Sequence, residues 1–401
     1  MAAAPIYLDH QATTPCDPAV VEAMAPWWSD GFANPSSRSH RPGLEAAAQL
    51  TLARERLACC LAVPADAVVF TSGATEANNL AIKGLCEARL TRGRHIVTVA
   101  TEHRAVLDPC RYLQSLGFEL TVLPVQPDGL LDLHALAAAL RPDTVLVSVM
   151  AANNEIGVLQ PIADISALCR PQGIAVHVDG AQLVGHQRVE PLALGIDLLS
   201  LSGHKFYGPK GVGALLVAPG VELKPQLHGG GQEGGLRSGS VPLPLAVGLA
   251  EALERALADA PQRAERLAGL RDRLWQGLQS LGGVTLNGCL DQRLAHNLNV
   301  SFAYVEGESL MMGIKNLAVS SGSACTSASL EPSYVLKALG VQEELAHTSL
   351  RIGFGRFTTE NEVKYATDVI VNEVKRLREL SPLWEMAQEG VDISKIKWAH
   401  H

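Results

Sequence analysis

Short apolar runs alternate with longer amphipathic stretches between residues 43 and 257. The apolar runs predict strands at residues 67–71, 95–100, 119–125, 144–150, 174–179, 197–202 and 212–217. Helical periodicity predicts helices at residues 44–61, 76–92, 105–116, 133–140 and 162–170. Strands separated by helical segments of this length are typical of βαβ units. We therefore expect an α/β layer with a mostly parallel sheet.

The pattern changes after this layer. Residues 244–281 predict one long helix rich in Ala, Leu, Glu and Arg, followed by short strands at 284–286, 298–302 and 350–352 and a closing helix near 360–380. A chain of 401 residues is also too long for one simple core. We therefore predict a large domain at residues 16–257, and a smaller α+β domain formed by residues 1–15 and 258–401.

Composition narrows the class of protein. Hydrophobic residues make up 47% of the chain and charged residues 18%, as in ordinary globular enzymes. A net charge of −8 argues against a nucleic-acid partner, and no apolar run reaches the ~18 residues of a membrane span. The first residues lack the regions of a signal peptide, so we expect a cytoplasmic protein. The eight cysteines form no C-x-x-C pair, so we predict no metal site.

Two candidate residues follow predicted strands. Lys205 ends the run Ser202-Gly203-His204-Lys205, and Asp179 lies 26 residues earlier at the end of another apolar run. Ligands bind at the carboxyl ends of strands in open α/β sheets. A lysine there can form a Schiff base and an aspartate can hold a pyridinium nitrogen, as in pyridoxal 5′-phosphate (PLP) chemistry. The alternative is a surface lysine and a helix-capping aspartate.

Residues 70–76 predict a phosphate site between a strand and a helix. Gly73 allows a tight turn, and Ala74 and Thr75 fall at the start of the helix, where backbone N–H groups and the helix dipole favour an anion. Ser202 and His204 offer further donors. Simple helix capping is the alternative. A second glycine-rich segment comprises residues 229–233 and 237–240 and includes Ser240. It fits a ligand contact, a subunit contact or plain turns equally well.

Four polar residues fit the ring and substrate end of such a site. His103 follows a predicted strand and suits ring stacking and proton transfer, although a helix-capping or core histidine is the common alternative. Asn154 suits a ring oxygen or a substrate carboxylate, with turn formation as its alternative. Gln182 lies three residues beyond Asp179. Arg351 sits in an apolar run and needs a partner, which is either a substrate carboxylate or an internal salt bridge.

Cys325 differs from the other cysteines in its surroundings. Residues 320–329 are nearly all small and polar, which predicts an exposed, flexible loop. A cysteine there can act as a nucleophile, although an incidental surface thiol is the alternative. Together with a PLP lysine, it suggests thiolate attack on the sulfur of PLP-bound cysteine, which leaves alanine and an enzyme persulfide.

These motifs together resemble the cysteine desulfurases, most closely the IscS type with a long catalytic-cysteine loop. The resemblance covers essentially the whole chain; it is carried by residues 7–15, 71–76, 101–103, 153–157, 202–205, 237–239, 320–334, 381–386 and 398–401. It implies the aspartate-aminotransferase-like fold, PLP fold type I, and a homodimer. It also implies L-cysteine as substrate, with an iron–sulfur scaffold protein and other sulfur acceptors as partners. The C-terminal tail resembles the part used for scaffold docking.

The resemblance also assigns roles to residues of this chain. Lys205 binds PLP covalently, Asp179 contacts the pyridinium nitrogen, His103 stacks on the ring and moves protons, and Gln182 contacts the ring hydroxyl. Thr75, Ser202 and His204 bind the phosphate, Ala74 belongs to the same cofactor site, and the segment with Ser240 reaches the phosphate of the opposite subunit. Asn154 and Arg351 hold the substrate carboxylate, and Cys325 carries the persulfide.

The chain departs from this family's pattern at a few positions. Ser240 stands where threonine is usual, Gly234 stands where an arginine is expected, and Asp179 is followed by Gly-Ala-Gln. Three other functions stay open at this point. A selenocysteine lyase or a cysteine sulfinate desulfinase would need Cys325 less, and a docking subunit would not need PLP at all.

Overall fold

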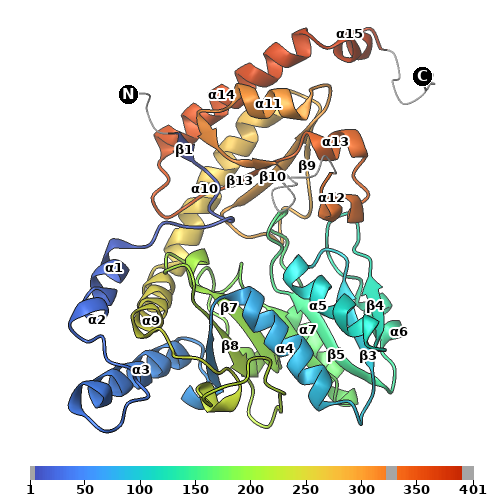
Figure 1. Ribbon diagram of the computed structural model, residues 1–401. Coiled ribbons are helices and arrows are strands. Elements are labelled where there is room, and N and C mark those ends of the chain that lie inside the picture. Colours follow the sequence, from blue (N-terminus) through green and yellow to red (C-terminus); the bar gives the residue numbers. More distant parts are fainter. Residues whose placement is uncertain (1–4, 322–331, 391–401) are drawn as a thin grey trace.

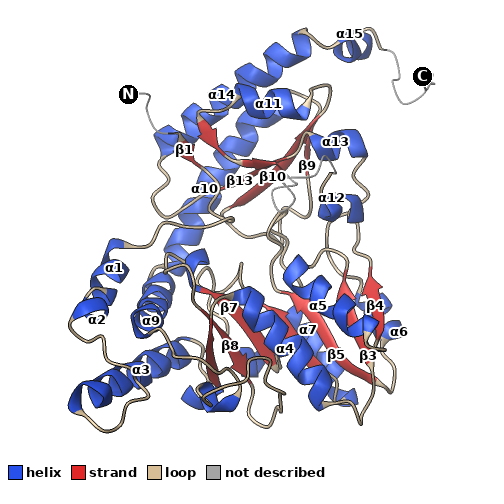
Figure 2. Cartoon of the chain, in the orientation of Figure 1, coloured by secondary structure: helices blue, strands red, loops and turns tan. Residues whose placement is uncertain are grey.

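The computed structural model describes residues 5–321 and 332–390. Figure 1 shows two stacked halves: a lower half built on a large sheet and an upper half built on a smaller one. Helices lie on both sides of the large sheet (Figure 2). The predicted division at residues 15/16 and 257/258 stays a prediction.

The lower half contains a seven-stranded sheet that positions the candidate residues. Its strand order is β2-β8-β7-β6-β5-β3-β4, and β8 alone runs antiparallel to both of its neighbours. The bounds are β2 Val68–Thr71, β3 His95–Val99, β4 Glu119–Leu123, β5 Thr144–Met150, β6 Ala175–Asp179, β7 Leu198–Ser202 and β8 Gly213–Val217. The α/β prediction is confirmed, since each predicted strand occurs with ends shifted by two residues at most.

Each face of this sheet is covered by helices because its strands carry apolar side chains on both faces. α4 (Ala74–Ala88) and α5 (Arg104–Ser115) pack on one face, and α3 (Arg41–Cys60), α7 (Ile162–Cys169) and α9 (Leu243–Ala258) contribute to the core on the other. The remaining helices of this half are α1 Pro18–Met24, α2 Pro26–Ser29, α6 Leu133–Ala139 and α8 Pro191–Leu194. A 3₁₀ turn at Gly203–Lys205 follows β7.

The upper half has a second hydrophobic core beneath an antiparallel sheet. The strand order is β12 (Ser320–Ser321), β13 (Leu350–Gly353), β10 (Asn297–Phe302) and β9 (Val284–Leu286). α10 (Ala260–Gln279) and α14 (Glu360–Glu379) supply leucine and valine side chains to this core. The upper half also contains the short helices α11 Gly307–Gly313, α12 Tyr334–Ala338, α13 Glu343–His347 and α15 Pro382–Gln388. β1 (Ile6–Tyr7) pairs in parallel with β11 (Leu317–Ala318).

The single long helix predicted at residues 244–281 is wrong. The chain instead forms α9 and α10, and Asp259 between them has a non-helical backbone. Pro261 lies in the first turn of α10, where a missing N–H is tolerated, whereas in a helix interior it would remove a hydrogen bond. Arg263 spans the break: it pairs with Asp259 and donates to the carbonyl oxygens of Ala256 (2.8 Å) and Gly185 (2.6 Å).

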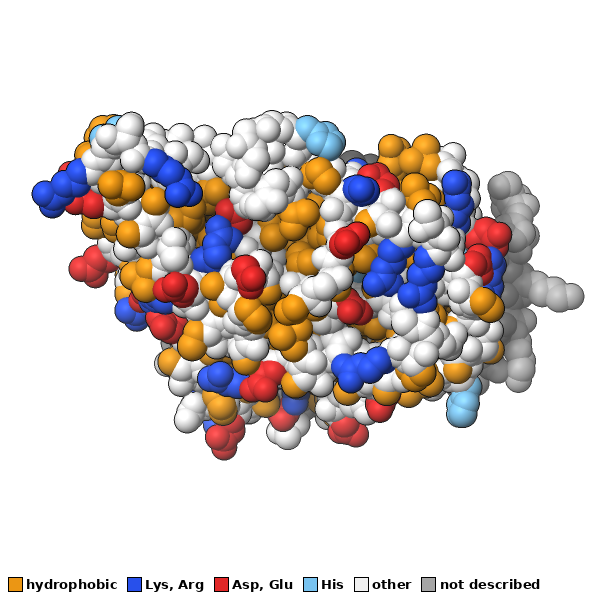
Figure 3. Space-filling model, turned by 90° about the horizontal axis from the view of Figure 1, so that it is seen from below, with side chains coloured by type: hydrophobic (Ala, Val, Ile, Leu, Met, Phe, Trp, Pro, Cys, Tyr) orange, Lys and Arg blue, Asp and Glu red, His pale blue; other side chains and the backbone are white. Residues whose placement is uncertain are grey.

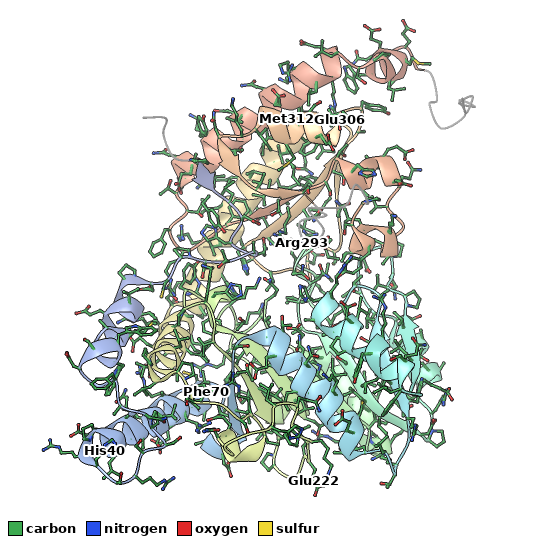
Figure 4. The ribbon with its side chains drawn as sticks, viewed as in Figure 1. His40, Phe70, Glu222, Arg293, Glu306 and Met312 are labelled. Carbon is green, nitrogen blue, oxygen red and sulfur yellow. The ribbon has the colours of Figure 1, made fainter. Side chains whose placement is uncertain are left out.

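The two halves meet through polar contacts as well as through the connecting chain. Figure 4 shows Phe70 in the lower half, Glu306 and Met312 in the upper half, and Arg293 at the level where the halves meet. Asn297 Nδ2 and Asn299 Nδ2 of the upper half donate to the Glu155 carbonyl of the lower half at 3.0 and 3.1 Å, and the backbone of the buried Arg293 pairs with that of Val158. Seen from below, acidic and basic side chains alternate with apolar ones across the face of the molecule (Figure 3).

Candidate active site

A cavity of about 670 Å³ lies at the carboxyl ends of the parallel strands. It is lined by ten of the predicted residues: Ala74, Thr75, His103, Asn154, Asp179, Gln182, Ser202, His204, Lys205 and Arg351. Clefts of this size are typical of cofactor and small-ligand sites. Two predicted residues are not among them. Ser240 is exposed and does not line the cavity, and Cys325 lies outside the described residues.

Asp179 ends β6 as a buried carboxylate whose two oxygens are both held. Oδ1 accepts a hydrogen bond from the Ala181 amide at 3.0 Å, and Oδ2 accepts one from Asn78 Nδ2 at 2.7 Å. Asn78 is completely buried on α4. These two donors fix the orientation of the carboxylate. The arrangement therefore suits an aspartate that stabilises a protonated ring nitrogen, and the sequence reasoning missed Asn78.

Lys205 is oriented by the N-terminal segment of the chain, which the sequence reasoning also missed. Its Nζ donates to the carbonyl oxygens of Gln11 (2.6 Å) and Ala12 (3.0 Å). The Lys205 carbonyl in turn lies 3.1 Å from His186 Nε2. Gln182 Nε2 also donates to the Gln11 carbonyl, at 3.0 Å. Residues almost two hundred positions apart thus define this part of the cavity.

The predicted phosphate end lies where α4 begins. Gly73 has φ +150°, which side chains rarely adopt, and α4 begins at the next residue. His204 Nδ1 lies 3.0 Å from Thr13 Oγ1. Burial, with smaller effects from the charges of Lys205 and Lys210, lowers the pKa of His204 to about 4. Before an anion binds beside it, His204 is therefore neutral at pH 7 and can act as a hydrogen-bonding group.

The segment predicted to contact the other subunit makes contacts within its own chain. Arg237 Nε pairs with Glu76 at 2.7 Å, and the Gly239 amide donates to Gln232 Oε1 at 2.8 Å. Gly234, where the family pattern has an arginine, adopts φ +63°, a conformation that favours glycine. The predicted role of Ser240 in a second subunit's site stays a prediction.

His103 both caps α5 and lines the cavity. Its Nδ1 accepts a hydrogen bond from the Ala105 amide at 3.0 Å, so the capping alternative is present in the structure. Burial lowers the pKa of His103. In the neutral ring the proton then sits on Nε2, since Nδ1 accepts. Any proton transfer by this residue must use Nε2.

Arg351 reaches the cavity from β13 of the upper sheet, and its internal salt bridge is present. Nη2 pairs with Asp9 Oδ1 at 2.8 Å and donates to Ser320 Oγ at 3.1 Å, while Nη1 donates to the Asn154 carbonyl at 3.1 Å. Within the described ranges, buried Arg351 Nε and Asn154 Oδ1 have no hydrogen-bond partner. Because buried polar atoms need partners, a ligand with both an anionic and a donor group, such as an amino acid, suits this end.

Two buried glutamates behind the cavity were not foreseen. Glu102 Oε1 accepts from the Met150 amide at 2.6 Å, and burial raises the pKa of this carboxyl. Ser333 Oγ donates to Glu155 Oε2 at 2.5 Å, and burial raises the pKa of Glu155 to about 7. Both acids lie next to predicted site residues in sequence, but a glutamate beside a strand end gives no signal of burial.

The described residues fit PLP in three respects. A helix N-terminus preceded by a glycine suits the phosphate, a buried carboxylate suits the ring nitrogen, and a lysine amine lies in the same cavity. Between residues 5 and 390, apart from 322–331, no cluster of His, Cys, Asp and Glu could hold a metal ion. In the same part of the chain, no helix is both long and apolar enough to cross a membrane.

Comparisons with known proteins find relatives that cover nearly the whole chain. The family model described as "Aminotransferase class-V" matches residues 6–366. A protein of Dechloromonas aromatica (strain RCB), "Cysteine desulfurase IscS", is 54% identical over 400 residues, which is 99% of each chain. A solved "NifS-like protein" is 36% identical with a TM-score of 0.87, covering 93% of this chain and all of its own. The solved "SspA in complex with cysteine" is 39% identical with a TM-score of 0.78, covering 88% and 100%.

Proposed function

The chain belongs to the cysteine desulfurase family of class-V aminotransferases, and we propose that it removes the sulfur of L-cysteine, leaving L-alanine and a persulfide on Cys325. The observation that carries this proposal is the convergence of Lys205, Asp179 and the α4 N-terminus on one cavity. The lining of this cavity would supply a site for each end of PLP and for an amino acid beside it.

PLP, when bound, acts as an electron sink for charge that develops on the substrate carbons. Lys205 would hold it covalently and Asp179 would keep its ring nitrogen protonated, with Asn78 fixing the carboxylate. The backbone at Ala74 and the side chains of Thr75, Ser202 and His204 would bind the phosphate. Gln182 would contact the ring hydroxyl, and His103 would stack on the ring.

Arg351 and Asn154 would hold the substrate. The guanidinium supplies charge and donors for the substrate carboxylate, which gains most from paired, charge-assisted hydrogen bonds. Asp9 and Ser320 fix the guanidinium before substrate arrives, so less ordering is needed on binding. His103 Nε2 would exchange protons with the substrate carbons.

Cys325 would accept the sulfur. Its thiolate attacks the sulfur of bound cysteine, so that an S–S bond forms and the substrate C–S bond breaks. The electron pair of the broken bond remains with the substrate β-carbon, which takes up a proton and leaves as part of alanine. The small, polar composition around Cys325 supports a thiol that can reach both the cavity and an acceptor.

The family resemblance is the basis for the proposed location, subunit assembly and partners. We propose a cytoplasmic homodimer in which Ser240 of each chain contacts the phosphate of the other site. We also propose that an iron–sulfur scaffold protein and other sulfur acceptors take the persulfide sulfur, with the C-terminal tail docking the scaffold.

Alanine release from L-cysteine in the presence of a reductant tests the function. We expect turnover by the wild type, loss of turnover in Cys325→Ser with PLP still bound, and loss of the covalent PLP absorbance in Lys205→Ala. Equal alanine release by wild type and Cys325→Ser would contradict the persulfide step and favour a lyase. A wild type that takes up no PLP would contradict the whole proposal and favour a docking role.

A further inference from the structure

The segment before β8 lies between the two predicted phosphate-binding segments. Gly213, the first residue of β8, pairs with Thr71 at the end of β2 and with Ser202 at the end of β7. Because β8 runs antiparallel to both strands, its amino end meets their carboxyl ends. Lys210 and Gly211 immediately precede it, and both line the cavity.

Glycines keep this edge of the cavity tightly packed. A Cβ on Gly213 would lie only 2.7 Å from Gly73 Cα, so no side chain separates β8 from the turn that opens α4. Gly211, with φ +83°, turns the chain into the strand. Lys210 therefore lies beside the part of the cavity that is lined by Gly73, Thr75, Ser202 and His204.

The predicted phosphate ligands carry little positive charge. Thr75 and Ser202 are neutral, burial lowers the pKa of His204 before any anion binds, and a helix N-terminus supplies only about half an elementary charge. A phosphate ester with a second pKa near 6 carries roughly −1.5 to −2 charges at pH 7. Glu76 adds a carboxylate to the lining, although Arg237 pairs with it.

The other lining cations are engaged elsewhere. Arg351 pairs with Asp9, and the Lys205 amine is assigned to the covalent link with PLP. Lys210 is exposed, and within residues 5–321 and 332–390 it makes no hydrogen bond or ion pair. Its charge lies close enough to His204 to lower the pKa of that histidine.

We propose that Lys210 is the cationic ligand of the cofactor phosphate. This inference rests on the proposed function, because it assumes that the cavity takes PLP. A lysine suits the task as a point charge on a long, flexible stem, which can reach a phosphate held by backbone amides.

Titration of the apo-protein tests the proposal, using PLP and pyridoxal, which lacks the phosphate. In Lys210→Gln we expect the dissociation constant of PLP to rise about tenfold or more, as for loss of a charge-assisted hydrogen bond. The dissociation constant of pyridoxal should stay within about twofold of the wild-type value, because the change removes only a phosphate contact. Lys210→Arg should keep most of the PLP affinity, and inorganic phosphate should compete with PLP better in the wild type than in Lys210→Gln.

Lys364→Gln is the matched control, since Lys364 is exposed on α14 in the upper half. Unchanged PLP affinity in Lys210→Gln would overturn the proposal, and so would an equal loss of PLP and pyridoxal binding. If the wild type bound neither PLP nor pyridoxal, both the proposed function and the role of Lys210 would be contradicted. If the wild type bound both compounds and Lys210→Gln had the same two dissociation constants, only the role of Lys210 would be contradicted.

Discussion

Asn78 is a positioning residue for the Asp179 carboxylate, and it also lines the cavity. Its Nδ2 donates to Asp179 Oδ2 at 2.7 Å from a fully buried position. Asn78→Ala should lower PLP affinity about tenfold and change the cofactor absorption band, because a buried carboxylate loses a donor. The neighbouring Asn79→Ala, whose side chain donates to the Thr75 carbonyl and not to Asp179, is the control. Equal PLP affinity in the two variants would contradict this role.

Glu155 should make stability depend on pH. Burial raises its pKa from 4.5 to about 7, so between these values the folded protein holds a proton that the unfolded chain releases. The stabilisation from this group is therefore fully present below about pH 4.5 and is lost as the pH rises from there to about 7. Relative to wild type, Glu155→Gln should gain up to about 3 kcal/mol between pH 4.5 and 8.

Urea unfolding at a series of pH values measures this difference. Glu308→Gln is the control, because Glu308 is an exposed acid on α11. A Glu155→Gln curve parallel to the wild type across this range would show that the buried carboxyl does not titrate there.

The sequence could predict the site residues that lie at or after strand ends. It could not predict the residues whose hydrogen bonds fix the orientation of those side chains. Asp179, His103 and Lys205 come directly after apolar runs, so their convergence follows from a parallel sheet. Asn78 and Asp9 have no such signal. Asp9 meets Arg351 across 342 positions, and periodicity carries no information about contacts at that distance.

At the scale of elements, apolar runs revealed each strand of the large sheet but not its order. The direction of β8 was hidden because a fully buried strand reads the same in either orientation. The helix break after α9 was missed although Pro261 signals it, because a proline inside a helical pattern ends or kinks the helix. The contact of Arg263 with the Gly185 carbonyl beside this break could not be predicted, since the two residues are far apart in sequence.

Arg263 should stabilise the chain break between α9 and α10. It is 4% exposed and donates to two carbonyls besides its pairing with Asp259. Arg263→Met should lower the free energy of unfolding by about 2–4 kcal/mol, because those carbonyls lose their donor and a buried pair is broken. Arg273→Met removes only an exposed pair with Glu360 and should cost under about 0.5 kcal/mol. Urea unfolding of both variants checks this, and equal losses would contradict it.

At the scale of the whole molecule, the proposed dimer predicts complementation between chains. Ser240 is exposed and lies outside its own cavity, as expected if it serves another site. Ser240→Asp should inactivate the homodimer by placing a carboxylate near the partner's phosphate. A heterodimer of Ser240→Asp with Lys205→Ala contains one site with both groups intact, so it should recover about half of the wild-type activity.

Differently tagged chains, co-expressed and purified as heterodimers, provide the material for this test. A heterodimer as inactive as its parents would contradict sharing of sites. A Ser240→Asp homodimer with full activity would contradict the role of Ser240 itself.

The pairing of β1 with β11 has a consequence for the order of synthesis. Ile6 pairs with Leu317, so 311 residues separate the partners, and Leu8 belongs to the same upper core. A ribosome that adds about 5–20 residues per second needs roughly 15–60 s to supply that partner. During this interval Ile6 and Leu8 lack their partners in the upper half, so the N-terminal segment can complete its docking only after more than three quarters of the chain has been made.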